Sequence, residues 1–485
     1  MKSICFALAG VAAVMAAVVA ARMLFGPFHF GPLQVTTPLN PEGFFGLAVT
    51  ILLLMRVAAN SAAPAWSRRS SVLVALGVVA ITLIALRRAL EIYFLSDDFI
   101  LVRIGQEWTA AAFRYSITHG GGDGFFRPFG YAAFALDGRL SGINAVWWHA
   151  SSIAIHGANA VLVLFLARRL GASVLAAGFA GALFAVHGIH PEAVIWIAGR
   201  FDLVATFFLL AGLLLFTMTD EGNGAVLHVA ALGCFTVAVL SKESAFIFPL
   251  LLAGYALAKR RPLKTTVWYF ALAAILFAYR WSLLGGIGGY INPATGRPAA
   301  LSLGFGSTLK AVAIRLWTSL YFPLNWSTDV SLPVALLAIS YMAAILWLAM
   351  RSQAARTVWL AAASILICAI PALSLLAGSP TLAGSRVLYL PSVWFALLFA
   401  LALEGTVRYG RVRYAVAGVV LVFHFAALQH NLGFWEVASA QVEAACETGI
   451  LSVANSVPNS IDGVPALANG KPECVEIVHN KSGQP

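Results

Sequence analysis

Long apolar runs alternate with short polar stretches along nearly the whole chain. Many of these runs reach about 17–25 residues, the length that a helix needs to cross the hydrocarbon core of a bilayer. The pattern therefore predicts an all-α polytopic membrane protein with about thirteen transmembrane helices. The expected spans are residues 1–25, 44–59, 72–94, 143–167, 174–186, 194–217, 225–240, 245–258, 267–284, 331–350, 357–377, 387–404 and 413–429.

Two stretches of this pattern allow more than one topology. Residues 1–25 have the composition of a signal peptide or of a first span, and we favour an uncleaved span. Residues 307–323 are apolar but are interrupted by Lys310 and Arg315. If this stretch lies along the outer interface or dips into it, every later basic loop falls on the cytoplasmic side, as the positive-inside rule prefers. With that choice the polar tail from residue 431 lies outside the cytoplasm.

Composition agrees with the pattern, because 60% of the 485 residues are hydrophobic and only 11% are charged. Soluble domains carry about 25% charged residues. The net charge of +11 could indicate nucleic acid, but many basic residues lie in short loops between spans, where membrane topology explains them. We therefore expect the lipid bilayer, and no nucleic acid, as a partner.

The five cysteines show no zinc-binding spacing. Cys446 and Cys474 lie in the polar tail, where a disulfide can form if the tail is outside the cytoplasm. The alternative is a pair of free thiols in a flexible end.

The acidic pair Asp97–Asp98 stands where the third span leaves the membrane. Ionised side chains are costly at a bilayer boundary unless something pairs or uses them. The outer loop that follows, residues 95–142, is the longest between two early spans, and we hypothesise that it is the catalytic face of a membrane enzyme. Two carboxylates can also bind a divalent cation, so a metal cofactor is left open. The alternative is that the pair only marks a helix end in water.

Several basic residues fall on the predicted outer face, against the positive-inside rule. Their position there therefore needs a local explanation. A phosphate-bearing ligand is one such reason, because guanidinium groups match phosphate oxygens in a bidentate way. The candidates are Arg127, Arg200, Lys242 and Arg386. The alternative is pairing with nearby carboxylates, such as Arg200 with Asp202 and Lys242 with Glu243.

His187, His190 and Glu192 form an HxxHxE cluster after the fifth span. Imidazole and carboxylate groups could hold a metal, but the spacing matches no compact zinc signature. We favour hydrogen bonding to a substrate or capping of a helix end. Asp202, at the start of the next span, joins these three as a candidate for substrate binding.

Several short motifs occur in the order in which a known family has them. They are Asp97-Asp98, Phe126-Arg127-Pro128, His156 with Asn159, residues 187–194, residues 199–203, Ser241-Lys242-Glu243, residues 386–392 and residues 431–436. On these motifs the chain resembles the GT-C class of polyprenyl-phosphate-sugar glycosyltransferases. Within that class it is most similar to the transmembrane and tetratricopeptide-repeat O-mannosyltransferases and their bacterial relatives. In two departures from the family, no tetratricopeptide repeats follow the last span and two extra spans precede the aspartates.

The resemblance implies a GT-C-like bundle in three parts. Two extra helices (1–71) precede a catalytic transmembrane domain (72–430), which carries the outer loop 95–142, and an extracytoplasmic tail (431–485) follows. It implies a hexosyltransferase that moves a sugar, with mannose as the guess, from a polyprenyl phosphate to an acceptor hydroxyl. An aspartate of the pair would be the general base, the transfer would invert the anomeric centre, and the basic residues would contact the donor phosphate. The acceptor would be a protein, lipid or glycan, at the periplasmic face of a bacterial inner membrane.

A secondary transporter or flippase for a lipid-linked or anionic substrate is the main alternative. A transporter would place charged residues around a central cavity, whereas the enzyme would have a cavity that opens only to the outside beside Asp97. A non-catalytic scaffold is a third alternative, favoured if both aspartates point away from any cavity.

Overall fold

The computed structural model describes the greater part of the 485-residue chain. The described residues are 28–30, 33–35, 68–119, 124–219, 224–291, 296, 298, 304–321, 323, 355–373, 382–404, 411–448, 457, 460–461 and 463–467.

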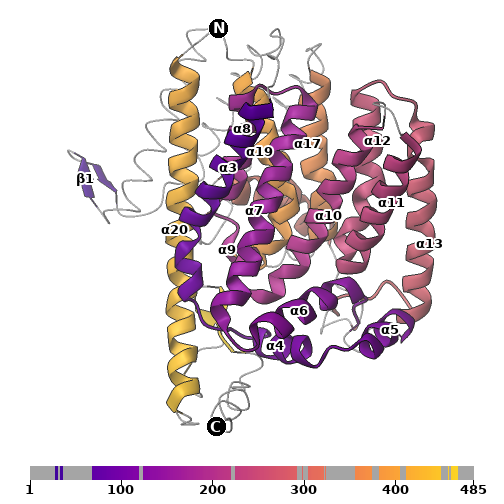
Figure 1. Cartoon of the computed structure of the whole chain (residues 1–485). Helices are drawn as coiled ribbons and strands as arrows, with labels where there is room; N and C mark the ends of the chain where they lie inside the picture. Colours follow the sequence, from indigo (N-terminus) through magenta and orange to yellow (C-terminus); the bar gives the residue numbers. More distant parts are fainter. Residues whose placement is uncertain are drawn as a thin grey trace.

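Helices form nearly all of the described structure, and five of them are long and apolar enough to cross a membrane. These are α7 (Ala145–Leu170), α10 (Arg200–Thr217) with the turn before it, α11 (Gly224–Ser241), α13 (Val267–Leu284) and α20 (Arg411–Thr448). Shorter apolar helices run beside them: α3 (Arg68–Ala85), α8 (Val174–Ala185), α12 (Phe248–Ala258), α17 (Ala355–Ala369) and α19 (Tyr389–Glu404). Figure 1 shows these helices side by side with roughly parallel axes. The chain is thus an all-α polytopic membrane protein, as the hydrophobic pattern predicts.

Every expected span that falls within the described residues contains one of these helices. The spans at 1–25, 44–59 and 331–350 lie outside the described residues. The number thirteen, the retention of residues 1–25 and the division into three parts therefore stay predictions.

The membrane-facing character of the bundle is plain at α13. Only 11% of its apolar window is buried, and Trp268 and Ile275 are 72% and 65% exposed. A helix that is apolar on all sides is normally buried in protein or lies in a bilayer. Since most of α13 is not covered by protein, lipid tails are its expected surroundings.

The third span is shorter than the predicted 72–94. Helix α3 ends at Ala85, and the 3₁₀ turn η1 (Arg87–Glu91) and an extended stretch follow. The side chain of Gln429, on α20, donates to the Ala85 carbonyl at 2.7 Å. It thus satisfies one of the carbonyls that a helix end leaves without a partner. Arg88 donates to the Gln429 carbonyl at 3.2 Å and pairs with Glu436, so polar contacts with α20 replace the expected last turns.

The loop 95–142 is largely helical, which the hydrophobic pattern does not predict. It contains α4 (Asp98–Glu107), α5 (Ala110–His119) and α6 (Pro128–Ser141), which lie across one end of the bundle in Figure 1. Pro128 suits the first turn of α6 because that position needs no N–H donor. Helices α4 and α6 cross closely at two glycines: a Cβ on Gly138 would lie 2.4 Å from the backbone carbon of Gly105.

Short elements connect the long helices. They are α9 (Pro191–Val194), η2 (Ile197–Gly199), η3 (Glu243–Ile247), η4 (Leu263–Thr266), α14 (Phe305–Lys310), the π-helical η6 (Ala311–Arg315), α15 (Leu316–Tyr321), η7 (Ile370–Ala372) and η8 (Ser385–Leu388). Residues 305–321 are thus helical throughout and α15 is buried along its whole length. The course of this stretch along or into the outer interface stays a prediction.

Two small hairpins complete the described structure. Strands β1 (Phe28–Phe30) and β2 (Leu33–Val35) form one, and β3 (Ser460–Ile461) and β4 (Val464–Pro465) form the other, both antiparallel. The β3–β4 hairpin packs on α20. The last turns of α20 lie at the same end of the bundle as α4, α5 and α6 (Figure 1). Cys446, in these turns, is buried and disulfide-bonded; Cys474 lies outside the described residues, so the pairing of these two cysteines stays a prediction.

Candidate active site

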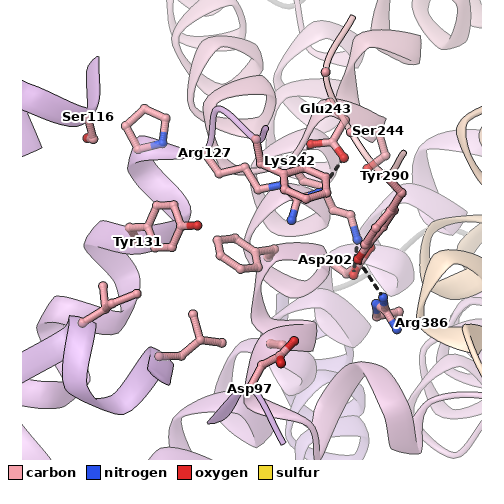
Figure 2. A pocket seen from close by; sticks show the side chains of 18 of the residues that line it. Asp97, Ser116, Arg127, Tyr131, Asp202, Lys242, Glu243, Ser244, Tyr290 and Arg386 are labelled. Carbon is pink, nitrogen blue, oxygen red and sulfur yellow. Dashed lines mark hydrogen bonds and ion pairs between the residues drawn. The ribbon is translucent and has the colours of Figure 1, made fainter. Parts of the chain in front are cut away.

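A cavity of about 1190 Å³ lies against α4, α5 and α6 (Figure 2). Its remaining wall comes from the turns that begin α10, α12 and α19, from the end of α13 with the stretch after it, and from the end of α17 with η7. Ligand pockets usually measure about 300–1,000 Å³, so the volume suits a large ligand or two smaller ones. The acidic lining residues are Asp97, Glu107, Asp202 and Glu243, and the basic ones are Arg127, Lys242, Arg280 and Arg386.

Asp97 lines this cavity and is the residue directly before α4. Its Oδ1 lies 3.5 Å from Ser96 Oγ, and in the part of the chain that the structure describes its carboxylate joins no ion pair. Partial burial raises the pKa of Asp97 above its usual value, although the positive charge of Arg386 opposes the rise. A carboxylate with a raised pKa takes up a proton more readily, as a general base must.

Asp98, by contrast, is buried in the protein and does not line the cavity. Its Oδ1 accepts from the Ile197 N–H at 2.9 Å and its Oδ2 from the Leu95 N–H at 3.0 Å. Burial raises the pKa of this carboxyl well above its usual value. The sequence interpretation treated the two aspartates together, but their places differ: Asp97 faces the cavity and Asp98 ties the start of α4 to η2.

Arg127 precedes α6 and lines the cavity, where Glu243 orients it. Its Nε and Nη2 donate to the two oxygens of Glu243 at 2.9 and 2.5 Å, which is the bidentate geometry that favours arginine. The guanidinium also lies 4.1 Å from the ring centre of Phe125. Burial opposes the charge, but the Glu243 carboxylate more than offsets this and raises the pKa of Arg127.

Lys242 pairs with Asp202, not with its neighbour Glu243. Its Nζ lies 2.5 Å from Asp202 Oδ2, and both residues are buried in the cavity wall. Burial lowers the pKa of Lys242, while the charge of Asp202 opposes the drop. The suggested local pair of Lys242 with Glu243 is therefore wrong, because Glu243 pairs with Arg127.

Arg386 is another basic residue that lines the cavity. Its Nη1 pairs with Glu192 and its Nη2 donates to the Tyr290 hydroxyl at 3.2 Å. The guanidinium lies 4.6 Å from the ring centre of Trp196. Figure 2 shows Arg127 and Lys242 above Asp97 in this view, with Arg386 to the right beside Asp202.

Glu192 holds Arg386 rather than lining the cavity. Its carboxylate accepts from the backbone N–H groups of Gly384 and Arg386 at 3.1 and 3.0 Å and from Ser385 Oγ at 3.1 Å. These bonds fix η8, the turn that carries Arg386. The predicted direct contact of Glu192 with a substrate has no support in this geometry, since Glu192 reaches the cavity only through Arg386.

Arg200 lies in the core, with 1% of its surface exposed, and is not part of the cavity lining. It pairs with Asp137 and donates to the Trp148 carbonyl at 2.6 Å and to Ser152 Oγ at 3.0 Å. The suggested ion pair with Asp202 is wrong, because α6 supplies the partner. Arg200 therefore joins α6, α7 and α10 and does not line the cavity in which a phosphate would bind.

His187 and His190 are also fully buried and away from the cavity. The ring centre of His187 lies 4.3 Å from that of His424, and the ring centre of His190 lies 4.9 Å from that of His156. His190 Nε2 lies 2.8 Å from Ser392 Oγ. Burial lowers the pKa of both His187 and His190, so they are neutral and join helices together.

Neither candidate metal cluster brings three ligands together within the described residues. Both oxygens of Asp98 accept backbone N–H groups and Glu192 is bound to Arg386. Within the described residues, no three His, Cys, Asp or Glu side chains are arranged to hold a metal.

Sequence reasoning missed several residues of the site. Tyr290, Trp196 and Glu107 line the cavity, and Asp137 is the partner of Arg200. Tyr290 follows a glycine-rich stretch, where an isolated aromatic is a usable signal. Glu107 and Asp137 lie in helices and Trp196 lies in the turn before η2, and no spacing in the sequence points to any of the three.

Comparison with known proteins finds similarity in short segments. Over 90 residues the chain is 42% identical to the protein O-mannosyl-transferase Tmtc2 of Drosophila melanogaster, which covers 18% of this chain and 10% of that protein. Over 136 residues it is 34% identical to Tmtc1 of the same species, covering 28% and 16%. The human protein TMTC3 is 32% identical over 121 residues, covering 24% and 13%.

The chain is similar to protein O-mannosyl-transferases. This confirms the resemblance drawn from the motifs, although the matched segment spans only 10–16% of these three O-mannosyl-transferases. No protein-family model matches the chain. Among solved structures, ArnT from Cupriavidus metallidurans in the apo state matches with a TM-score of 0.33 and 16% identity, over 76% of this chain and 79% of that one.

Proposed function

We propose that the protein is an integral-membrane glycosyltransferase that moves a sugar from a polyprenyl-phosphate donor to an acceptor hydroxyl. One observation carries the proposal: a carboxylate, Asp97, and a cluster of three cations, Arg127, Lys242 and Arg386, line the same cavity. Moving a sugar off a lipid phosphate requires a base for the acceptor proton and positive charge for the departing phosphate. The names of its relatives suggest mannose as the sugar.

The cations are held in place before any ligand arrives. Glu243, Asp202 and Glu192 orient Arg127, Lys242 and Arg386, respectively. Each of these cations has several N–H donors, of which the carboxylates use only some. Donors fixed in this way need little reorganisation when the phosphate charge develops, and this is the main source of electrostatic catalysis.

Asp97 is the base in this proposal. It takes the proton of the acceptor hydroxyl as the oxygen bonds to the anomeric carbon and the bond from that carbon to the phosphate oxygen breaks. The products are the glycosylated acceptor and the polyprenyl phosphate, and a single displacement of this kind inverts the anomeric centre. Asp98 has no part in proton transfer because both of its oxygens hold the turn beside Asp97.

The place of the cavity favours an enzyme over a transporter. It lies against α4, α5 and α6, which cover one end of the bundle (Figure 1), and it is bounded by the turns at helix ends. A transporter site is expected near the middle of the membrane between repeated halves. We infer that this end faces the periplasm, because the topology that places it there leaves the basic loops inside.

Cells with and without the gene provide the test. Cells that lack it should accumulate the lipid-linked sugar and lose one glycosylated product. The wild-type chain should restore that product, and the Asp97→Asn chain should not, although it is inserted in equal amount. Identical lipid-linked sugars and glycans in both cell lines would overturn the proposal.

A further inference from the structure

The turn that carries Asp97 has a strained backbone. Ser96 has φ of +50°, and among the described residues Arg260 is the other non-glycine residue with positive φ. This left-handed conformation is uncommon for residues with a side chain and persists when the surroundings impose it. The conformation of Ser96 sets the direction in which the chain enters α4, and therefore where the next side chain, Asp97, stands.

Two of the hydrogen bonds that impose this conformation come from the far end of the sequence. The Ser96 N–H donates to the Ala466 carbonyl at 3.3 Å, and the Tyr93 N–H donates to Ser439 Oγ at 2.9 Å. Ser439 belongs to α20, and Ala466 directly follows the β3–β4 hairpin.

The two contributors form one packed unit, which we call the C-terminal brace: the last turns of α20, residues 436–448, with residues 460–461 and 463–467. Ala466 and Val464 are 0% and 4% exposed, and Ser439 is 3% exposed. Cys446 is 2% exposed and disulfide-bonded. The partner of this disulfide lies outside the described residues.

We propose that the C-terminal brace is a positioning element for Asp97, with Ser439 as its positioning side chain. The inference rests on the proposed function only in taking Asp97 as the reacting group. The brace does not line the cavity, so it acts on Asp97 through the segment that leads to it, residues 88–96. Loss of the Ser439 hydroxyl removes no contact of Arg127, Lys242 or Arg386 but lets the carboxylate move, and misplacement of a reacting group by about 1 Å can cost on the order of a hundredfold in rate.

The experiment compares Ser439→Ala with Ser439→Thr, which keeps the hydroxyl, in the full-length chain in lipid nanodiscs. Gln441→Ala is the matched control, because Gln441 is exposed on the same helix. Amide hydrogen exchange of residues 92–97 and the steady-state kinetics with polyprenyl-phosphate mannose are measured. Ser439→Ala should exchange about tenfold faster in this turn, since one hydrogen bond that fixes it is lost.

The kinetics separate positioning from general damage. In Ser439→Ala, kcat should fall about tenfold or more, with donor KM changed less than about twofold, because the cations that bind the phosphate are untouched. Ser439→Thr and Gln441→Ala should match the wild type. As a second variant, Cys446→Ser should also speed exchange at Ser96, because it frees the brace without touching the turn.

Exchange at residues 92–97 that is unchanged in both Ser439→Ala and Cys446→Ser would overturn the proposal. So would faster exchange with unchanged kcat, or a rise in donor KM alone. A wild-type chain that binds the donor but transfers no sugar would overturn the proposed function instead, and the exchange result would still decide whether the brace fixes this turn.

Discussion

The different surroundings of Asp97 and Asp98 predict opposite effects of the same substitution. Asp97→Asn changes a cavity-lining carboxylate that joins no ion pair in the described structure, whereas Asp98→Asn changes a buried carboxyl whose two oxygens each accept a backbone N–H. Asparagine has nearly the same size as aspartate, so neither substitution opens a cavity. The loss in each variant is therefore the loss of one chemical property.

The magnitudes follow from the contacts. In Asp98→Asn, the new side-chain amide would keep one oxygen as acceptor and would turn its NH₂ toward the second backbone N–H, which leaves a buried donor unsatisfied. That costs about 1–3 kcal/mol of the free energy of unfolding. Asp97→Asn should change this free energy by less than about 0.5 kcal/mol. It should lower turnover about 10²- to 10⁴-fold, the usual contribution of a general base.

Both variants are assayed in the same preparation, by denaturant unfolding in detergent and by release of polyprenyl phosphate from a radiolabelled donor. We expect Asp97→Asn to be stable and inactive. We expect Asp98→Asn to be less stable, with residual turnover at low temperature that exceeds that of Asp97→Asn. An inactive but fully stable Asp98→Asn chain beside an active Asp97→Asn chain would refute the assignment.

Three further predictions test other parts of the structure. Lys242→Met should weaken donor binding. It should also lower the free energy of unfolding by about 3–5 kcal/mol, because it leaves the buried Asp202 charge unpaired. The double variant Lys242→Met/Asp202→Leu should regain the unfolding stability but not the donor affinity. Gly138→Ala should lower the melting temperature, because the new Cβ would overlap α4 and such overpacking costs about 1–3 kcal/mol. Gly77→Ala is the control: its new Cβ meets open space, so the melting temperature should stay unchanged or rise. Arg386→Gln should move the acidic limb of the pH–rate profile to higher pH. The charge of Arg386 lowers the pKa of the Asp97 carboxyl, so without it Asp97 becomes protonated at higher pH. An acidic limb that stays in place or moves to lower pH would contradict the placement of Arg386.

The long apolar helices could be predicted from the sequence because one property, hydropathy over a window of a span's length, decides them. The helices within residues 95–142 could not. They are short and mix apolar with polar positions, since α4 packs one side on the core through Phe99 and Val102 and turns Ile100 and Ile104 to the cavity. Each of these helices has only 10 or 14 residues, so a window of a span's length runs past its ends and averages it with its neighbours.

The candidate site was predictable in its residue types but not in its pairings. Asp97, Arg127, Lys242 and Arg386 come together in the cavity, and the motifs named all four. The local pairs suggested for Arg200 and Lys242 are wrong because the neighbouring carboxylates in the sequence are not their partners in space. In the structure the carboxylates come from other helices, 63 residues away for Arg200 and 40 residues away for Lys242. The two aspartates lie in different places because η2 packs beside the start of α4, and no local sequence pattern predicts that contact.

The most direct test is a structure of the Asp97→Asn chain in nanodiscs with polyprenyl-phosphate mannose, because this variant should bind the donor without consuming it. We expect the donor phosphate within hydrogen-bonding distance of at least two of Arg127, Lys242 and Arg386, and the anomeric carbon on the side of residue 97. A donor headgroup found outside this cavity, or seated in it with its sugar turned away from residue 97, would contradict the account.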